Sequence, residues 1–269
     1  MQPMLNIAIR AARIASENLV RAIERLDVIR AEGQDVNKFI RETCQRAEQS
    51  IARSLQKAYP NHSVTGSVGG QAGEAVAEPE ASWTVNALNG ELNYSRGLPS
   101  FTLSMVAHIR GKAEHMLIIH PMSSDEYTAS RGRGAQLNGR RIRLSNKAQL
   151  DGAMVSLSFD NTISNRHLLS TYMNAQRQLM MCNTHLHQTG SALLDMASVA
   201  AGQVDAGIFF AQTDLELDAG TLLLQEAGAL LGDISGNPSY RQNGHVLAGN
   251  AKLFKALIQQ LQSVSGDLS

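Results

Sequence analysis

Two histidines and one serine stand in patterns that sometimes carry chemistry. His185 and His187 flank a single residue, so on a strand both imidazoles would point the same way, as two ligands of one metal must. On a helix they would not share a face, and no third ligand is evident. Ser191 lies in Thr-Gly-Ser-Ala, which lacks the Gly-x-Ser-x-Gly turn of hydrolase nucleophiles. We expect no metal at the histidines and a helix-capping role for Ser191.

A run of arginines offers a different chemistry, the recognition of anions. Gly132 and Gly134 within this run do not complete a dinucleotide-binding fingerprint. Such a run is usually a solvated, ion-paired surface, but it also suits a docking face for RNA or for an acidic partner protein. Both interpretations stay open. The run consists of Arg131, Arg133, Arg140, Arg141 and Arg143.

The composition is that of an ordinary globular protein. The 269 residues include 24 Lys+Arg and 24 Asp+Glu, so the net charge is zero and any contact with nucleic acid must use a local patch. Aromatic residues make up only 4%, which argues against a base-stacking platform. Cys44 and Cys182 lie far apart, and no stretch resembles a signal peptide or approaches membrane-spanning length. We expect a cytoplasmic protein without membrane contact.

Two subdomains, residues 1–150 and 151–269, are expected to position these side chains. In the first, apolar stripes predict helices, Pro60 ends the second helix, and Asn138-Gly139 marks a hairpin turn. Its helices are expected at 4–23 and 37–58, a mobile loop at Gly66–Glu80, and strands at 83–85, 102–109 and 116–119.

In the second subdomain, predicted strands and helices follow one another. The strands are expected at 154–159, 204–210, 230–232 and 245–248, and the helices at 166–181, 189–201, 218–227 and 251–262. Layers of helix and sheet in both halves predict an α/β or α+β sandwich.

Five segments together resemble the inositol monophosphatase family, and its bacterial SuhB-like branch in particular. They occur in the family's order and spacing, and the resemblance extends from Met4 to Leu261. It implies a layered α-β-α-β-α fold, a homodimer, and hydrolysis of phosphate monoesters by magnesium ions held among clustered carboxylates. The segments are Ser130–Gly139, Thr189–Asp195, Val199–Ala206, Gln225–Gly228 and Ala248–Asn250.

The family's first metal motif, a tryptophan followed by Asp-Pro-Leu-Asp-Gly-Thr, falls on Trp83 to Glu91, with Asp-Pro-Leu-Asp-Gly-Thr on Asn86 to Glu91. Both aspartates are replaced by amides, Asn86 and Asn89, and Leu88 occupies a further ligand position. A neutral amide oxygen does not offset the dehydration of Mg²⁺ as a carboxylate does. The water-orienting threonine is replaced by Glu91, next to Gly90. The motif therefore keeps its shape and loses its charge.

Other catalytic positions of the family are also changed in this chain. The paired glutamates that ligate metal and activate water correspond to Ser67 and Val68, and the Trp-Asp metal ligand corresponds to Leu215-Glu216. A substrate-contacting glutamate corresponds to Phe209. The resemblance makes Gly90, Glu91, Gly190, Ser191 and Phe209 remnants of a substrate pocket.

Basic residues have entered the neighbourhood of the former metals. The family's upstream Asp-x-Val-Thr-x-x-Asp motif corresponds to Lys38, Arg41 and Cys44. We expect Lys38 or Arg41 to form ion pairs with Glu91 or Glu216 in place of the metals. The alternative is that Glu91 faces solvent as a charge at a helix N-terminus.

These replacements predict a catalytically inactive member of the family. The resemblance implies a regulatory or scaffold role, in line with SuhB proteins that assist ribosomal RNA transcription antitermination through protein contacts. The alternatives are a residual Mg²⁺-dependent inositol-1-phosphate phosphatase and a sensor of a phosphate ligand. No cofactor is expected, except Mg²⁺ if the phosphatase alternative holds.

Overall fold

The computed structural model describes residues 3–160 and 162–265, and side chains as far as residue 262. The contacts divide the chain into two units. The first runs to Arg131 and includes Leu137–Gly139, and the second comprises Gly132–Gln136 and the chain from Arg140 onward. This division lies before the expected border at residues 150 and 151. No helix in the described ranges has the length and apolar character needed to cross a membrane.

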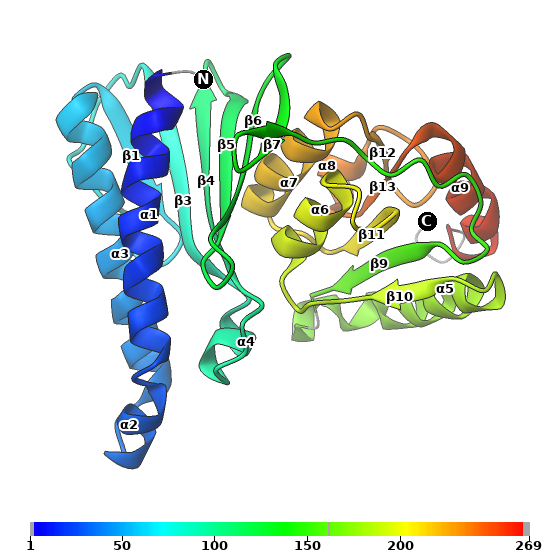
Figure 1. Cartoon of the computed structure of the whole chain (residues 1–269), viewed down its shortest axis with the longest axis horizontal. Coiled ribbons are helices and arrows are strands. Elements are labelled where there is room, and N and C mark those ends of the chain that lie inside the picture. Colours follow the sequence, from blue (N-terminus) through cyan, green and yellow to red (C-terminus); the bar gives the residue numbers. More distant parts are fainter. Residues whose placement is uncertain (1–2, 161, 266–269) are drawn as a thin grey trace. The chain divides into compact units, whose positions relative to one another are not determined.

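The first unit consists of a helical layer and an extended sheet (Figure 1). Four short elements, α2, β1, β2 and β6, have no counterpart in the sequence-based expectations. The elements are α1 (Pro3–Ile23), α2 (Leu26–Ala31), α3 (Val36–Ala58), β1 (His62–Gly66), β2 (Gly70–Gln71), β3 (Ala81–Asn89), α4 (Glu91–Ser95), β4 (Thr102–Ile109), β5 (Lys112–His120) and β6 (Asp125–Ser130).

The helices α1 and α3 cover one face of this sheet. Apolar residues recur along α1 at helical spacing, and Leu5, Ile9 and Leu19 are buried as expected. α1 packs on β4 and β5, whereas α3 packs on β1 and β3. Asp35 caps α3 by accepting hydrogen bonds from two backbone amides, which fixes where the helix begins. Both long helices expected from the sequence are therefore confirmed.

The strands of the first unit lie in the order β2-β1-β3-β4-β5-β6. β1 is parallel to β3, and β2 folds back on β1 with Gly66 opposite Gly70. The segment expected as a mobile loop thus opens with a hairpin. Further along, Gln56 exchanges two hydrogen bonds of 2.8 Å with the backbone of Glu74. The segment expected as a mobile loop from Gly66 to Glu80 therefore contains a paired strand, β2, and is bound by Gln56.

A second hairpin lies where the chain passes between the units. β7 (Gly134–Leu137) and β8 (Arg140–Arg141) flank Asn138-Gly139. Both turn residues have positive φ, 52° and 76°, as a two-residue hairpin turn of this type requires. The predicted turn is confirmed.

The second unit has a smaller sheet with strand order β10-β9-β11-β13-β12. The helices α5 and α9 pack against each other, as do α6 and α7 (Figure 1). Its elements are β9 (Met154–Phe159), a 3-10 helix (Ile163–Leu168), α5 (Leu169–Met181), β10 (His185–His187), α6 (Ala192–Ala200), β11 (Ala206–Phe210), α7 (Asp214–Glu226), β12 (Leu230–Gly232), α8 (Tyr240–Asn243), β13 (Val246–Gly249) and α9 (Ala251–Ser265).

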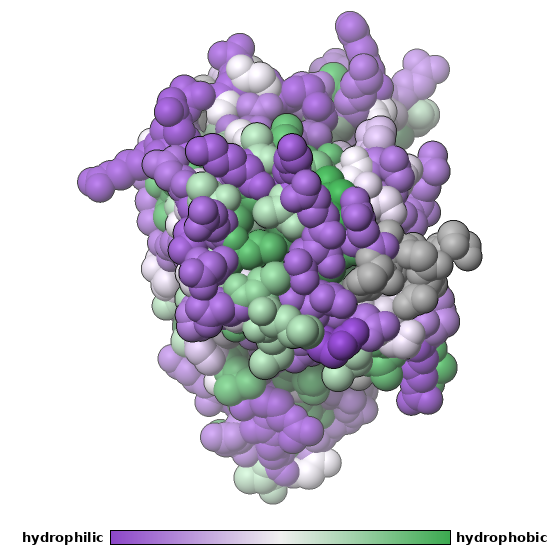
Figure 2. All heavy atoms as spheres, turned by 90° about the vertical axis from the view of Figure 1, so that its right-hand side faces the viewer, coloured by the Kyte–Doolittle hydropathy of each residue, from purple (hydrophilic) through white to green (hydrophobic). Residues whose placement is uncertain are grey.

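The second unit exposes apolar side chains as well as burying them. Figure 2 shows apolar side chains gathered among hydrophilic ones on the face it turns to the viewer. On α5, Leu169, Met173 and Met180 are 43%, 52% and 60% exposed. Outward-facing methionines and leucines of this size suit contact with another protein surface.

Candidate functional site

The two amides of the altered metal motif lie at the end of β3. The pairing of β3 with β4 shifts between Asn86 and Asn89, which stand opposite Ser104 and Thr102. Residues three apart on a regular strand face opposite sides, but the extra residue of a bulge restores a common side. Asn86 and Asn89 therefore face the same side of the sheet, and both are half-buried.

Asn86 is engaged by hydrogen bonds from its own unit. Its Oδ1 accepts from the backbone amide of Leu88 at 3.0 Å and lies 3.1 Å from the hydroxyl of Ser67. Two donors thus surround the oxygen that corresponds to a metal-ligating carboxylate oxygen. Binding of a cation there would have to displace both.

The partner that organises this region is Glu48, which sequence reasoning missed. Glu48 is only 1% exposed and lies on α3. One carboxylate oxygen, Oε1, accepts from the Ser67 hydroxyl at 3.0 Å and the Val68 amide at 3.2 Å, and Oε2 accepts from the Gly69 amide at 3.1 Å. A buried carboxylate needs such donors to offset its lost hydration. The Ser67 hydroxyl has one hydrogen, so it serves Glu48 or Asn86 at any one time.

Gly66 makes room for this buried carboxylate. A Cβ at position 66 would lie 2.0 Å from Glu48 Oε2, so any other residue would force Glu48 to move. The only sequence signal for this contact is an acidic residue on a stripe of α3 that is otherwise apolar, beside Ala47 and Ile51. We call Glu48, Ser67 and Asn86, with the amides of Val68 and Gly69, the amide-and-carboxylate cluster.

Glu91 lies just after this cluster, in the first turn of α4. It follows Gly90, whose φ of 92° is a left-handed conformation that favours glycine. Glu91, Lys38 and Arg41 are all exposed, and within the described part of the chain Glu91 forms no ion pair with either basic residue. Glu91 therefore lies as the alternative expects, exposed in the first turn of a helix, while Lys38 and Arg41 project from the outer face of α3.

Cys44, one turn beyond Arg41, is buried. Burial raises the pKa of its thiol to about 12, and the negative charges of Glu48 and Glu91 act in the same direction. A thiol that holds its proton so firmly does not act as a nucleophile at neutral pH. Cys44 therefore belongs to the core of the first unit.

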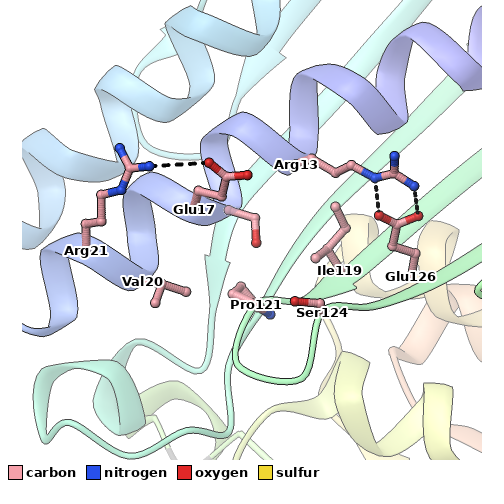
Figure 3. A pocket seen from close by; sticks show the side chains of 9 residues that line it. Arg13, Glu17, Val20, Arg21, Ile119, Pro121, Ser124 and Glu126 are labelled. Atoms are coloured by element: carbon pink, nitrogen blue, oxygen red, sulfur yellow. Dashed lines mark hydrogen bonds and ion pairs between the residues drawn. The ribbon is translucent and has the colours of Figure 1, made fainter.

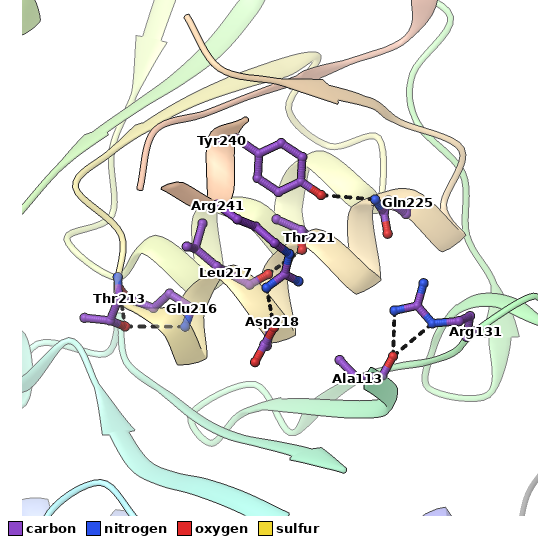
Figure 4. A network of polar contacts seen from close by, with 10 residues as sticks. All are labelled: Ala113, Arg131, Thr213, Glu216, Leu217, Asp218, Thr221, Gln225, Tyr240 and Arg241. Carbon is purple, nitrogen blue, oxygen red and sulfur yellow. Dashed lines mark hydrogen bonds and ion pairs between the residues drawn. The ribbon is translucent and has the colours of Figure 1, made fainter. Parts of the chain in front are cut away.

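In the second unit, Glu216 lies in the first turn of α7 (Figure 4). Its carboxylate accepts from the amide of Thr213 at 2.8 Å, while the Thr213 hydroxyl accepts from the Glu216 amide. This reciprocal capping box starts the helix at Asp214, so the expected start at Asp218 is wrong. Farther along α7, Asp218 pairs with Arg241 at 2.6 Å.

The other positions that the resemblance assigns to a substrate pocket differ in burial. Phe209 is fully buried in β11, with its ring against Gly207, which places it in the core of the second unit. Gly190 is exposed and has a positive φ of 81°. Ser191 stands at the N-cap of α6, but its side chain makes no capping hydrogen bond, so the expected capping role is wrong.

A buried carboxylate follows on α6. Asp195 is fully buried and accepts from the Thr189 amide at 3.1 Å. Its Oδ1 lies 3.5 Å from Nδ1 of His187 on β10. Burial raises the pKa of Asp195 to about 6, although Thr189 and the charge of His187 act in the opposite direction. His187 thus has an acidic neighbour, whereas His185 is exposed on the same strand.

The arginine run divides between two environments. Arg131 donates through Nε and Nη2 to the carbonyl oxygen of Ala113 at 3.1 and 2.7 Å and lies 3.5 Å from Glu114, all within the first unit (Figure 4). The guanidinium of Arg131 is therefore already bound within the first unit. The remaining four arginines are exposed, and none of them takes part in an ion pair in the described ranges. They are Arg133, Arg140, Arg141 and Arg143.

A carboxylate of α7 holds the turn that carries these arginines. Glu226 accepts from the amides of Gly132 and Gly134 at 2.7 and 2.6 Å. Both glycines have positive φ, 71° and 84°, which directs their amides to one side. Two segments that were recognised separately in the sequence therefore bind each other. The side chain of Arg141 lies over Gly134, where any Cβ would meet its guanidinium at 3.1 Å.

The residues present do not fit a magnesium site. At the family's metal positions within the first unit, Val68 has no ligand atom in its side chain, Asn86 and Asn89 are neutral, and Asn86 Oδ1 already accepts a hydrogen bond. Mg²⁺ requires carboxylate oxygens to offset its reluctant dehydration. In the described ranges, no three His, Cys, Asp or Glu side chains are grouped closely enough to hold a metal.

Comparison with known proteins shows similarity over nearly the whole chain. A family model described as "Inositol monophosphatase family" matches residues 1–265. The Nus factor SuhB of Pseudomonas aeruginosa is 42% identical over 265 residues, 97% of each chain. The Nus factor SuhB of Escherichia coli K12 is 34% identical over 268 residues, 99% of this chain and 98% of the other. The crystal structure of the extragenic suppressor protein suhB from Bartonella henselae has a TM-score of 0.81 at 25% identity, covering 97% of this chain and 100% of the other.

Proposed function

The chain belongs to the inositol monophosphatase family, and we propose that it is a SuhB-like accessory protein without magnesium-dependent phosphatase activity. The layered α/β fold expected from the resemblance is confirmed by the similarity to a solved suhB structure. On this fold the proposed role is regulatory: the protein assists transcription antitermination through contacts with other proteins.

The amide-and-carboxylate cluster is the observation that supports the loss of catalysis. Metal-assisted hydrolysis needs unengaged carboxylate oxygens that share two cations. Glu48 instead directs its oxygens to Ser67, Val68 and Gly69, and Asn86 Oδ1 accepts from Leu88. These polar groups satisfy one another, so the cluster is stable without a metal.

The proposed partners follow from the relatives named Nus factor SuhB and from the exposed arginines. No acidic residue occurs between Tyr127 and Leu150, so the segment around the second hairpin is strongly basic in a chain of zero net charge. We propose the four exposed arginines as a docking patch for an acidic surface of the antitermination machinery. The protein would act there as a cytoplasmic homodimer, and the apolar side chains exposed on α5 support the pairing.

Hydrolysis of inositol 1-phosphate in excess Mg²⁺ tests the central proposal. We expect no turnover and no Mg²⁺-dependent rise in unfolding temperature, because only a ligand that binds the native state stabilises it. Restoring the family residues together should return some hydrolysis if the pocket is otherwise intact. The changes are Ser67→Glu, Val68→Glu, Asn86→Asp, Asn89→Asp and Glu91→Thr. Hydrolysis by the unaltered protein that disappears in Glu216→Ala would overturn the proposal.

Residual phosphatase activity is the second candidate. It is favoured by Glu216, which keeps a carboxylate at a family metal position, and by two further carboxylates in the first unit, Glu91 and the Glu48 that binds Ser67. The same assay decides between the two candidates, since only this one gives Mg²⁺-dependent turnover by the unaltered protein.

The partner proposal has its own test, co-purification with the transcription-antitermination proteins of the source cell. Reversing the charge at Arg133, Arg140 and Arg143 together should abolish capture, and capture by the unaltered protein should weaken as salt increases. Lys255→Glu, an exposed change on α9, is the matched control and should leave capture intact. Equal capture by both variants would exclude the arginine patch.

A further inference from the structure

A cavity of about 330 Å³ lies between α1 and α3 in the first unit, on the helical layer of the unit. Three arginines are among the residues that line it, Arg21, Arg25 and Arg46. Arg21 and Arg46 come from the facing stripes of α1 and α3, and Arg25 comes from the turn that follows α1. Residues three or four apart on a helix lie on one face. Asn18, Ala22 and Arg21 of α1, and Phe39, Thr43 and Arg46 of α3, therefore line the cavity together.

Two of the guanidinium groups are positioned by neighbours at the cavity. The Arg25 guanidinium carbon lies 5.6 Å from the ring centroid of Phe39, a cation–π arrangement. Arg46 Nη2 donates to the hydroxyl of Thr43 at 3.3 Å, and that hydroxyl donates to the backbone oxygen of Phe39 at 2.8 Å. Thr43 is buried, whereas the arginines are exposed. Each guanidinium retains further N–H groups that can face a ligand.

These charges have little internal compensation. No acidic side chain lines the cavity in the described ranges. Arg21 lies 3.5 Å from Glu17, but both side chains are largely exposed (Figure 3). Ion pairs between exposed side chains contribute little stabilising energy. Neither Arg25 nor Arg46 takes part in an ion pair among the described residues.

A neighbouring cavity on the same helix shows the opposite arrangement. It has a volume of about 400 Å³ and is also lined by Arg13, whose guanidinium forms a two-pronged pair with Glu126 (Figure 3). The charge of Arg13 is therefore neutralised within the chain. In the cavity between α1 and α3, by contrast, Arg25 and Arg46 take part in no ion pair among the described residues.

Helix electrostatics account for only part of the arginine cluster. Arg21 and Arg25 lie at the C-terminal end of α1, where basic residues complement the helix dipole. Arg46 lies in the interior of α3, which runs from Val36 to Ala58, so the ends of that helix do not explain it. Its bond to Thr43 holds it at the cavity.

We propose that this cavity is a binding site for a small anion that carries at least two phosphate groups. Arginine guanidinium groups present paired N–H donors that match phosphate oxygens, and three of them exceed what a single phosphate can engage in this way. The volume lies within the range of small-molecule sites. The site uses none of the residues of the former metal site or of the arginine docking patch.

Isothermal titration of the whole protein with inorganic pyrophosphate, without added metal, tests the proposal. We expect saturable binding that is tighter than that of orthophosphate and weakens as salt increases. Arg46→Gln should weaken it roughly tenfold or more, the effect of losing a charge-assisted hydrogen bond. Arg53→Gln, an exposed change on the same helix, should leave it unaltered.

Two further variants separate this site from the other anion-attracting surfaces. Arg25→Gln should weaken pyrophosphate binding like Arg46→Gln, whereas Arg140→Gln in the docking patch should not. The urea midpoint of each variant shows that it is folded. Absence of binding, or loss in Arg140→Gln with retention in Arg46→Gln, would overturn the proposal.

Discussion

Two carboxylates on different helices do the same work in different surroundings. In the first unit, Glu48 accepts from the amides of Val68 and Gly69, and in the second, Glu226 accepts from those of Gly132 and Gly134. Each thereby fixes a turn that contains glycine. Glu48 is almost completely buried, while Glu226 is half-buried.

The difference lies in what each carboxylate stabilises. Glu48 binds Ser67 and Val68, at positions that the resemblance to the family assigns to metal binding, and Glu226 lies beneath a hairpin that presents arginines. In both places a negative charge compensates backbone N–H groups, which are strong partners for a carboxylate. Glu48 and Glu226 therefore both act by holding backbone turns in place.

The largest expected effect comes from removing the carboxylate of Glu48, the buried member of this pair. Glu48→Ala should lower the free energy of unfolding by about 3 to 4 kcal/mol, because it removes a buried side chain and the acceptor of three donors. Gly66→Ala should act in the same direction, since its Cβ would meet the carboxylate. Urea unfolding measures both.

Glu42→Ala is the control for Glu48→Ala, since Glu42 is an exposed acid on the same helix. It should change the free energy of unfolding by no more than about 0.5 kcal/mol. If Glu42→Ala and Glu48→Ala were equally mild, the Glu48 contacts would not stabilise the turn.

A third carboxylate sharpens the comparison through pH. Asp195 is fully buried, and its pKa of about 6 exceeds the ordinary 3.8. The folded state therefore binds a proton more readily than the unfolded chain, so the stability from Asp195 is complete below pH 3.8 and is lost as pH rises towards 6. Between those values the loss should reach at most about 3 kcal/mol.

Asp195→Asn isolates that contribution, because an amide does not titrate. The difference in unfolding free energy between the unaltered protein and Asp195→Asn should change between pH 4 and 6.5 and be level above. His187→Gln is measured in parallel, because Nδ1 of His187 lies 3.5 Å from the Asp195 carboxylate. A difference that does not vary with pH would show that Asp195 keeps an ordinary pKa.

The smallest expected effect concerns Glu226. Glu226→Gln keeps one acceptor oxygen and removes the charge, and the site is partly exposed, so we expect a loss of about 1 kcal/mol. Glu48→Gln should cost more, because burial leaves its amide without water. Equal losses in a denaturant titration would remove the distinction between the two carboxylates. Hydrogen exchange at Gly132 and Gly134 should also become faster in Glu226→Gln.

Elements with strong local patterns were predictable. The apolar stripe of α1 shows its helical period directly, the mostly apolar run of β4 indicates a buried strand, and Asn138-Gly139 specifies its turn. The start of α7 was not found, because the Thr213–Glu216 capping box was interpreted as part of a metal motif. β6 carries polar residues among its apolar ones, so its sequence gives no clear strand signal.

The candidate site was predictable as a set of replaced positions but not as a set of contacts. Asn86, Asn89 and Glu91 follow one another along one segment, so the sequence resemblance located them. Glu48 is separated from Ser67 by a helix end and a strand, and no period relates the two. Similarly, nothing in the sequence indicates that Glu226 reaches Gly132, because only the folded unit brings α7 to the hairpin.

The position of Glu226 at the last residue of α7 gives this helix a mechanical property. Glu216, near its other end, is ten residues away, a separation of about 15 Å along a rigid α-helix. A force on the arginine hairpin passes through two short hydrogen bonds into one end of that rod and reaches the capping box at the other. A partner that pulls on the hairpin would therefore place the Thr213–Glu216 cap under tension.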